Sequence, residues 1–321
     1  MGKQNTGKSK GDNRMSVKIN ILEIETPNTL QPISCTKKLS ECHVAGISYI
    51  DALKWRLEHI LMDLNRECPF ERVLNIRSDF WPSLEIIHTL FQSFLSKALS
   101  VVIDGKNIPV AWFSKGVEPE TELKSFIGID NKSHLIIHPW DLLYVNEDII
   151  STLEKNDIQG TVKENVNIDG FVEVGEGTVL LPGVYIEGNV IIGENCKIGP
   201  NCYIRGNTYI GHDCHVGQAV EIKNSILMDK VKVGHLSYVG DSILCTGTNF
   251  GAGTITANLR HDGNNHKSFI KNKLIDTTRR KLGVIVGDGV HTGINTSFYP
   301  GRKLWPNTST SPGEIVKKDK K

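Results

Sequence analysis

The 321-residue sequence has no long apolar run, no excess of one charge and few aromatic residues. Because no stretch approaches the roughly 20 apolar residues of a membrane span, and no signal peptide opens the chain, we expect neither a membrane anchor nor secretion. A formal net charge of +1 gives no sign of a nucleic-acid or acidic partner. These absences predict a soluble, cytoplasmic protein that binds neither membranes nor nucleic acid.

From residue 174 to residue 228, an aliphatic side chain recurs at every sixth position. A period of six is neither the 3.6 of a helix nor the alternation of a strand, and is typical of hexapeptide β-helices. Each hexapeptide forms one flat side of a coil, 18 residues make one turn, and neighbouring coils satisfy the backbone hydrogen bonds. The sequence therefore predicts a mainly β protein built on a left-handed parallel β-helix. The recurring residues are Val174, Leu180, Ile186, Ile192, Ile198, Ile204, Ile210, Val216, Ile222 and Met228.

The seven cysteines form neither a zinc-binding pattern nor an even set. Cys196, Cys202 and Cys214 fall four residues after a repeating aliphatic residue, at positions where Val or Thr stands elsewhere. We interpret them as small core residues of the coil and expect no disulfide and no metal.

The chain divides into three predicted parts. Residues 1–14 lack large apolar side chains and are expected to be a disordered tail. They contain GKQNTGKS, which formally matches a phosphate loop but follows no strand, and MGKQNT, which fits a myristoylation pattern. Residues 15–145 are expected to form a small α/β domain that precedes the β-helix of residues 146–321, which carries an inserted basic loop at 259–280.

Within the small domain, apolar stripes predict helices at 47–67 and 83–98. β-Rich runs predict strands at Val101–Asp104, Pro109–Phe113 and Leu135–His138.

Two cations interrupt a glycine pattern inside the repeat. The residue after the aliphatic position is Gly at several coils, but it is Arg205 and Lys223 at two of them. They lie one 18-residue coil apart, so they are expected to stack about 4.8 Å apart on one corner. Two stacked cations repel each other unless an anion lies between them, which favours an anion site, for a phosphate, over two solvated charges.

The residues around this pair resemble a known family. The motifs VEIK (220–223), GHLSYVGD (234–241) and NFGAGTITAN (249–258) resemble the acetyltransferase half of the bifunctional glucosamine-1-phosphate N-acetyltransferase / N-acetylglucosamine-1-phosphate uridyltransferase. The segments 277–316 and HPWDLLYVNE (138–147) are similar to archaeal sugar-1-phosphate nucleotidyltransferases with amino-sugar acetyltransferase activity. This resemblance implies an N-acetyltransferase that moves an acetyl group from acetyl-CoA to glucosamine-1-phosphate or galactosamine-1-phosphate.

The resemblance also implies roles for individual residues. His235 matches the catalytic base, a role that suits an imidazole. Acetyl transfer is expected to need no metal, and the family implies a homotrimer with each site between two subunits. The positions that match sugar-phosphate contacts are Arg205, Lys223, Tyr238, Asn249 and Lys267, and those around acetyl-CoA are Ala252 and Asn258.

Departures from the family pattern concentrate on the acetyl-CoA side. Leu259 stands where the family has a tyrosine, two residues are inserted after it, and Ile294 replaces a serine. Asn264 stands where the archaeal proteins carry a second lysine beside the position of Lys267. The resemblance therefore supports the predicted cofactor contacts less fully than the predicted sugar-phosphate contacts.

Other functions remain open at this point. The first domain lacks the glycine-rich nucleotide loop of the uridyltransferases, so we interpret it as a shortened nucleotidyltransferase-like remnant and expect no UDP-sugar formation. A sugar-1-phosphate nucleotidyltransferase with a divergent first domain, or a non-catalytic scaffold that binds sugar phosphate, is the alternative. A zinc site of the γ-carbonic anhydrase type would need His212, His215 and His235, which do not share an 18-residue spacing. A long-chain acyltransferase of the lipid A type shares the fold, but the motifs favour a sugar 1-phosphate.

Overall fold

The computed structural model describes residues 17–64, 73–96, 100–114 and 125–321. The contacts of the chain define two compact units, one of Leu53–His134 with the residues up to Ile24, the other of Glu25–Ala52 with Leu135–Lys321. The predicted tail at 1–14, with its phosphate-loop and myristoylation patterns, lies outside the described residues. None of the described helices is long and apolar enough to cross a membrane.

The first unit is a five-stranded mixed sheet with a helix packed against it. The strand order is β1-β4-β7-β6-β8, and β4 pairs antiparallel with β7. Helix α2 (Leu84–Leu95) contacts β6 and β7, and its N-terminus is capped by Ser83, whose Oγ accepts a hydrogen bond from Ile86 N at 3.0 Å. The strands of this sheet are β1 (Lys18–Leu22), β4 (Val73–Arg77), β6 (Ser100–Ile103), β7 (Pro109–Ser114) and β8 (Ser125–Gly128), while β5 (Phe80–Trp81) pairs with β9 (His134–Leu135) in a separate two-stranded sheet.

The helices and strands that the sequence predicts for the small domain are present, but their ends differ from the predicted ones. Helix α1 spans Tyr49–Leu64 and α2 lies inside 83–98, while β6 and β7 match the predicted strands within one residue. The strand predicted at Leu135–His138 is shorter, since β9 is only His134–Leu135. The chain then turns, because the Asp141 carboxylate accepts hydrogen bonds from Ile137 N and His138 N, and helix α3 (Asp141–Ile150) begins.

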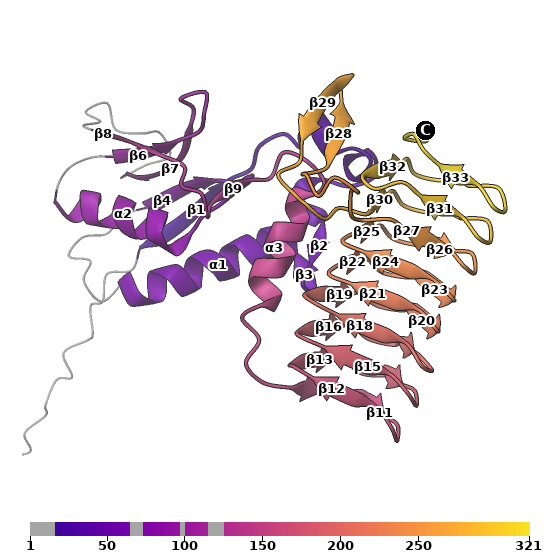
Figure 1. Ribbon diagram of the computed structural model, residues 1–321. Coiled ribbons are helices and arrows are strands. Elements are labelled where there is room, and N and C mark those ends of the chain that lie inside the picture. Colours follow the sequence, from indigo (N-terminus) through magenta and orange to yellow (C-terminus); the bar gives the residue numbers. More distant parts are fainter. Residues whose placement is uncertain (1–16, 65–72, 97–99, 115–124) are drawn as a thin grey trace, which may run out of the picture. The chain divides into compact units, whose positions relative to one another are not determined.

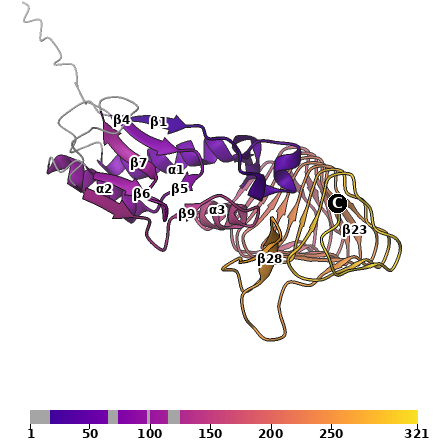
Figure 2. The ribbon, with the colours of Figure 1, turned by 90° about the horizontal axis from the view of Figure 1, so that it is seen from above.

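The second unit contains a left-handed parallel β-helix of hexapeptide repeats, which confirms the predicted fold class. Its coils stack in one column (Figures 1 and 2), and three parallel sheets form three faces. The first face is β10 (Asp157–Ile158), β13 (Val172–Val174), β16 (Val190–Ile192), β19 (Thr208–Ile210), β22 (Ile226–Leu227), β25 (Ile243–Leu244), β30 (Val284–Val286) and β32 (Arg302–Leu304). The second face is β11 (Thr161–Val162), β14 (Val179–Leu180), β17 (Lys197–Ile198), β20 (His215–Gln218), β23 (Lys232–His235) and β26 (Asn249–Phe250). The third face is β12 (Asn167–Asp169), β15 (Tyr185–Glu187), β18 (Tyr203–Arg205), β21 (Glu221–Lys223), β24 (Tyr238–Gly240), β27 (Ile255–Thr256), β31 (Ser297–Phe298) and β33 (Ile315–Val316).

The six-residue period predicts the inside of the coils well. Nine of the ten aliphatic residues of the predicted series lie in one buried core, together with Cys196, Cys202 and Cys214 as small neighbours. The cysteines of the described residues are free, as expected. The prediction that Met228 points into the core is wrong. The register advances by 18 residues from Ile192 to Ile210 but by 17 from Ile210 to Leu227, so Leu227 takes the inward place.

The outer side of the first face is apolar and covered. Its outward side chains on successive coils, Ile191, Tyr209, Ile226, Ile243 and Ile285, are all buried. Full burial of one such side chain contributes about 1.5–3 kcal/mol, so this layer adds a second apolar contact to the core.

The cover comes from helix α3 and from residues 25–52. Asn146 of α3 donates to Asn207 O at 2.9 Å and accepts from Ala45 N at 3.0 Å. Gly46 has φ +89°, and a Cβ there would meet Ile191 Cγ2 at 3.5 Å, so glycine suits this turn. The segment comprises the short 3₁₀ helices η1 (Asn28–Leu30), η2 (Ile33–Cys35) and η3 (Leu39–Glu41) and the strands β2 (His43–Val44) and β3 (Ile47–Ser48). Residues 25–52 and 135–145 thus group with the β-helix, which differs from the division at 145/146 expected from the sequence.

The chain leaves the coils once, between β27 and β30. The excursion includes an antiparallel hairpin, β28 (Lys267–Ile270) and β29 (Lys273–Asp276), which projects from the column in Figure 1. It occupies the region predicted as the basic loop, and the repeat resumes at Val286 as the sequence indicates.

Candidate functional site

Arg205 and Lys223 are neighbours on the third face. Arg205 ends β18, Lys223 ends β21, and the two residues are paired in register on adjacent coils. The 18-residue spacing therefore predicted their stacking correctly. Both side chains lie where the third face turns toward the first, a place named here the third–first corner.

Each of these cations has a carboxylate partner that spacing alone did not reveal. Glu221 Oε1 accepts from Arg205 Nε at 2.8 Å and Nη2 at 2.7 Å, and this hydrogen bond raises the pKa of the Arg205 guanidinium. Lys223 Nζ lies 3.0 and 3.2 Å from the Asp241 carboxylate oxygens. The repulsion between the two cations is thus offset within the protein. An anion would bind beside two ion pairs rather than between two bare charges.

Asp241 is the centre of a hydrogen-bond network at this corner. Its carboxylate is 3% exposed and accepts from Lys223, from Asn224 Nδ2 at 3.2 Å and from Asn258 Nδ2 at 2.5 Å. Asn258 Nδ2 also lies 3.0 Å from Tyr238 Oη, and burial raises the pKa of the Tyr238 phenol. Asn258, predicted beside acetyl-CoA, therefore has its side chain among the residues predicted to hold the sugar phosphate.

His235 lies at the corner between the second and third faces, named here the second–third corner. It ends β23, its side chain is exposed, and its carbonyl accepts hydrogen bonds from Ser237 Oγ and Gly253 N. Ala252 occupies the same corner on the next coil, and Ile294 follows on the coil after that, where Asn295 N donates to Ala252 O. The base predicted from the motif and one residue predicted near acetyl-CoA are therefore stacked on one corner.

A cavity on the third face lies between these two corners. It has a volume of about 520 Å³ and is open to solvent. Tyr203, Glu221 and Tyr238 contribute polar groups to it, and Leu236, next to His235, forms part of its wall. A small polar ligand in this cavity would lie between the His235 corner and the network of Asp241. Its other lining residues are Gly183, Tyr185, Asn201, Cys202, Ala219, Val220, Ser237 and Ile255.

Two predicted residues lie apart from this group. Asn249 is on the second face, where it pairs with Lys232 and bridges to His291. Lys267 is exposed on the hairpin, opposite Asp276. The altered position Leu259 is exposed and bridges to Lys281 near the base of the excursion.

The sequence motifs left out several residues that complete the corner. Glu147 of α3 accepts from Asn224 Nδ2 at 2.7 Å and pairs with Arg279 of the excursion, whose guanidinium carbon lies 4.6 Å from the centre of the Tyr144 ring. The phrase HPWDLLYVNE contains Glu147 and Tyr144, so the signal was present, but only folding shows that this helix meets the corner.

The excursion also places a buried histidine behind Asn258. His266 is buried, and its Nε2 lies 2.9 Å from Asn258 O. Burial lowers the pKa of His266, and Arg260 and Arg302 lower it further, so the neutral imidazole is favoured there. His266 therefore links the excursion to the residue that bonds both Tyr238 and Asp241.

Within one chain, the histidines of the alternative zinc site do not form a ligand set. His212 Nδ1 accepts a hydrogen bond from Glu194 N at 3.0 Å, while His215 and His235 stand at opposite ends of neighbouring second-face strands. Among the residues that the structure describes, no three His, Cys, Asp or Glu side chains group as a metal site would require.

Comparisons with known proteins match the β-helical half of the chain. A family model described as the GMPPB C-terminal domain matches residues 186–297. A bifunctional sugar-1-phosphate nucleotidylyltransferase/acetyltransferase of Sulfurisphaera tokodaii is 42% identical over 181 residues, which are 56% of this chain and 45% of that protein. The bifunctional protein GlmU is 43% identical over 181 residues in Methanocaldococcus jannaschii and 51% over 182 residues in Methanococcus maripaludis strain C7. These matches cover 56% and 57% of this chain and 44% of each relative. The C-terminal half is thus homologous to GlmU-type bifunctional proteins, and the match spans under half the length of these relatives.

Proposed function

We propose that this chain is an acetyl-CoA-dependent N-acetyltransferase that acts on an amino-sugar 1-phosphate, glucosamine-1-phosphate or galactosamine-1-phosphate. The observation that carries the proposal is the 42–51% identity of the β-helical half to bifunctional relatives, one of them named as a sugar-1-phosphate nucleotidylyltransferase/acetyltransferase. The open cavity between the two corners supports it, since its wall includes Leu236, which is next to His235, and Glu221, which is the partner of Arg205.

In the proposed reaction, His235 takes a proton from the sugar ammonium group. The neutral amine then attacks the thioester carbonyl of acetyl-CoA, and coenzyme A leaves as the thiol. Such a base typically contributes about 10²–10⁴-fold to the rate. A backbone amide near Ala252 would stabilise the oxyanion that forms during the attack.

The sugar phosphate is proposed to bind at the third–first corner. Arg205 and Lys223 would supply the positive charge, with Tyr238 beside them. Asn249 and Lys267 lie apart from this corner within one chain, so they would contact the sugar phosphate only from a neighbouring copy. Asp241 and Glu221 hold the two cations in place, so the phosphate would meet side chains that are already oriented. Asn258 is proposed to orient Tyr238 and Asp241, with Ala252 on the acetyl-CoA side.

The direct test is release of free thiol from acetyl-CoA in the presence of each amino-sugar 1-phosphate. We expect release with glucosamine-1-phosphate or galactosamine-1-phosphate and none with the amino sugars that lack phosphate. If no amino-sugar 1-phosphate supports release while the phosphates still bind, the chain is a scaffold that binds sugar phosphate. Formation of UDP-sugar from UTP would instead favour a divergent nucleotidyltransferase in the first unit.

A further inference from the structure

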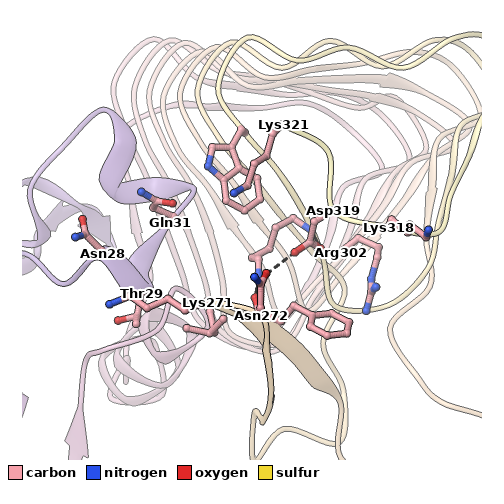
Figure 3. Close-up of a pocket in the computed structure, with 13 residues that line it drawn as sticks. Asn28, Thr29, Gln31, Lys271, Asn272, Arg302, Lys318, Asp319 and Lys321 are labelled. Atoms are coloured by element: carbon pink, nitrogen blue, oxygen red, sulfur yellow. Dashed lines mark hydrogen bonds and ion pairs between the residues drawn. The ribbon is translucent and has the colours of Figure 1, made fainter.

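A second cavity, of about 730 Å³, lies at the last coil of the β-helix (Figure 3). Three segments of the second unit enclose it, namely η1 with Gln31, the tip of the hairpin, and the chain from β32 to the last described residue. Figure 3 shows Asn28, Thr29 and Gln31 facing Asp319 and Lys321 across the opening. None of the residues proposed for the transferase site lines it, although Lys267 stands on the same hairpin. Its lining residues are Asn28, Thr29, Gln31, Phe269, Ile270, Lys271, Asn272, Arg302, Lys303, Trp305, Lys318, Asp319 and Lys321.

The charges around this cavity are mostly positive. Five of its lining residues are Lys or Arg, and Asp319 is the one acid among them. Asp319 pairs with Lys303, at 3.2 Å between Oδ2 and Nζ. Within the part of the chain that the structure describes, the remaining cations Lys271, Arg302, Lys318 and Lys321 make no ion pair, so the cavity suits an anion.

Lys303 makes the wall of the cavity rigid. Its side chain is 2% exposed, and Nζ donates to Ser268 Oγ at 2.9 Å and to Phe269 O as well as pairing with Asp319. These contacts attach the hairpin to the last coil. The base of the cavity is therefore a built element of the fold, and the four unpaired cations lie around a fixed frame.

The uncharged residues that line the cavity suit a ligand larger than a simple ion. Trp305 is half-buried with Lys321 Nζ 4.7 Å from its ring centre, and Phe269 is a second aromatic residue in the wall. Asn28, Gln31 and Asn272 carry amide groups, which can both donate and accept hydrogen bonds. Aromatic rings that stack, amides that pair with a base edge, and cations for phosphates together describe recognition of a nucleotide.

We propose that this cavity binds a nucleoside diphosphate, free or as part of a nucleotide sugar, at a site distinct from the transferase site. The phosphates would contact Lys271, Lys318 and Lys321, and the base would lie against Trp305. A cavity of this size falls in the usual range for small-molecule sites. The proposal does not depend on the proposed acetyl transfer.

Isothermal titration of the full chain with UDP tests it directly, since no catalysis is needed. We expect saturable binding that weakens as salt is raised. Lys271→Glu and Lys318→Glu, at exposed positions, should each weaken binding about ten- to a hundred-fold, as expected when a charge-assisted contact is lost. Trp305→Leu should weaken it about five- to a hundred-fold. Lys163→Glu, an exposed lysine of an early coil, is the matched control and should bind UDP as the wild type does.

Two further titrations distinguish a nucleoside diphosphate from other phosphate-containing ligands. Inorganic pyrophosphate should bind more weakly than UDP, and UDP should bind with the same Kd when coenzyme A is present in excess. Unchanged binding in both lysine variants would overturn the proposal. So would displacement of UDP by coenzyme A, which would make the cavity part of the acetyl-donor site. Equal affinity for pyrophosphate and UDP, with no effect of Trp305→Leu, would overturn the nucleoside part.

Discussion

At the scale of single residues, the two corners differ in how their functional side chains are held. His235 is exposed on a corner, whereas Lys223 is paired with a nearly buried carboxylate. Sequence motifs identify such residues because the chemistry requires particular side chains. The motifs did not show that Glu221 pairs with Arg205 or that Asp241 pairs with Lys223. These contacts join residues that lie 16 and 18 positions apart on different coils.

His235→Ala should lower the turnover number for acetyl transfer by about 10²–10⁴-fold. Because the side chain is exposed and lies outside the core, the melting temperature should stay within about a degree or two of the wild type. Steady-state kinetics and calorimetry measure the two effects. His261→Ala, at an exposed position in the excursion, is the control. A fully active His235→Ala enzyme with an inactive His261→Ala enzyme would transfer the role of base to His261.

Lys223→Ala should raise KM for the sugar phosphate about ten- to a hundred-fold, because a charge-assisted contact is lost. Arg205→Ala should act in the same direction but more weakly, since Arg205 is more exposed and its charge is better screened. KM for acetyl-CoA should change little in both variants, which separates a substrate effect from general damage. Sugar-phosphate kinetics identical to the wild type in both variants would exclude the third–first corner as the phosphate site.

At the scale of elements, the excursion between β27 and β30 is fixed to the β-helix rather than free. Arg279 pairs with Glu147 of α3, and His266 reaches the backbone of Asn258. The lysines of the hairpin are exposed, while the residues at its base are buried. The charge of this segment predicted a basic loop, but no local pattern indicated that its base belongs to the corner network.

Arg279→Ala should lower the free energy of unfolding by about 3–5 kcal/mol, because it leaves Glu147 without its cation in a largely buried setting. Arg280→Ala is a matched control at an exposed neighbouring position and should change stability by less than about 0.5 kcal/mol. Chemical denaturation of the two variants measures the difference. Equal stabilities would mean that the ion pair with α3 does not hold the excursion.

The buried His266 predicts a dependence of stability on pH. Its pKa is lowered in the folded protein, so below about pH 6.5 the unfolded chain binds a proton that the folded chain does not. The free energy of unfolding should therefore fall as pH decreases through this range, and should be unaffected by this group at higher pH.

His266→Gln provides the comparison, since glutamine keeps a polar group near Asn258 O but cannot titrate. Melting temperatures measured from pH 7.5 to 5 should fall less steeply for the variant than for the wild type. His215, whose pKa burial also lowers, contributes equally to both proteins and cancels in the difference. Parallel curves would show that His266 is not held neutral.

At the scale of the whole molecule, the third face leaves large apolar side chains exposed. Tyr185, Ile255 and Ile315 lie on it, and Leu236 and Ile294 lie at the second–third corner. Such a surface suits contact between copies of the chain. It also borders the proposed transferase cavity, so residues of a neighbouring copy could complete that site.

We expect a trimer, with a mass three times the 35.6 kDa of the chain by light scattering at micromolar concentration. Tyr185→Asp with Ile315→Asp should break the contact and give monomers, because charge is placed in an apolar interface. Leu274→Asp, at an equally exposed position on the hairpin, should remain trimeric and serves as the control. A monomeric wild type that still transfers acetyl groups would exclude a site between subunits.

The repeat predicted the β-helix because a period of six is a local property that every coil shows separately. The same regular register places the motif residues His235, Ala252, Lys223 and Tyr238 on neighbouring coils. Predictions were weaker in the first unit, where the strands β1 and β4 were missed. Asn20 and Asn75 interrupt their apolar pattern, and only the sheet shows that the two side chains bond each other at 2.7 Å.

The repeat pattern alone therefore specifies the coil, its core and the stacking of Arg205 on Lys223. Tertiary structure alone decided what lies outside the repeat. The first of two successive 17-residue coils, from Ile210 to Leu227, replaced Met228 by Leu227 in the core, and residues 25–52 with α3 covered the first face. It also brought Glu147 and Arg279, 132 positions apart, to one corner. Such contacts depend on where a long excursion returns, which no local pattern encodes.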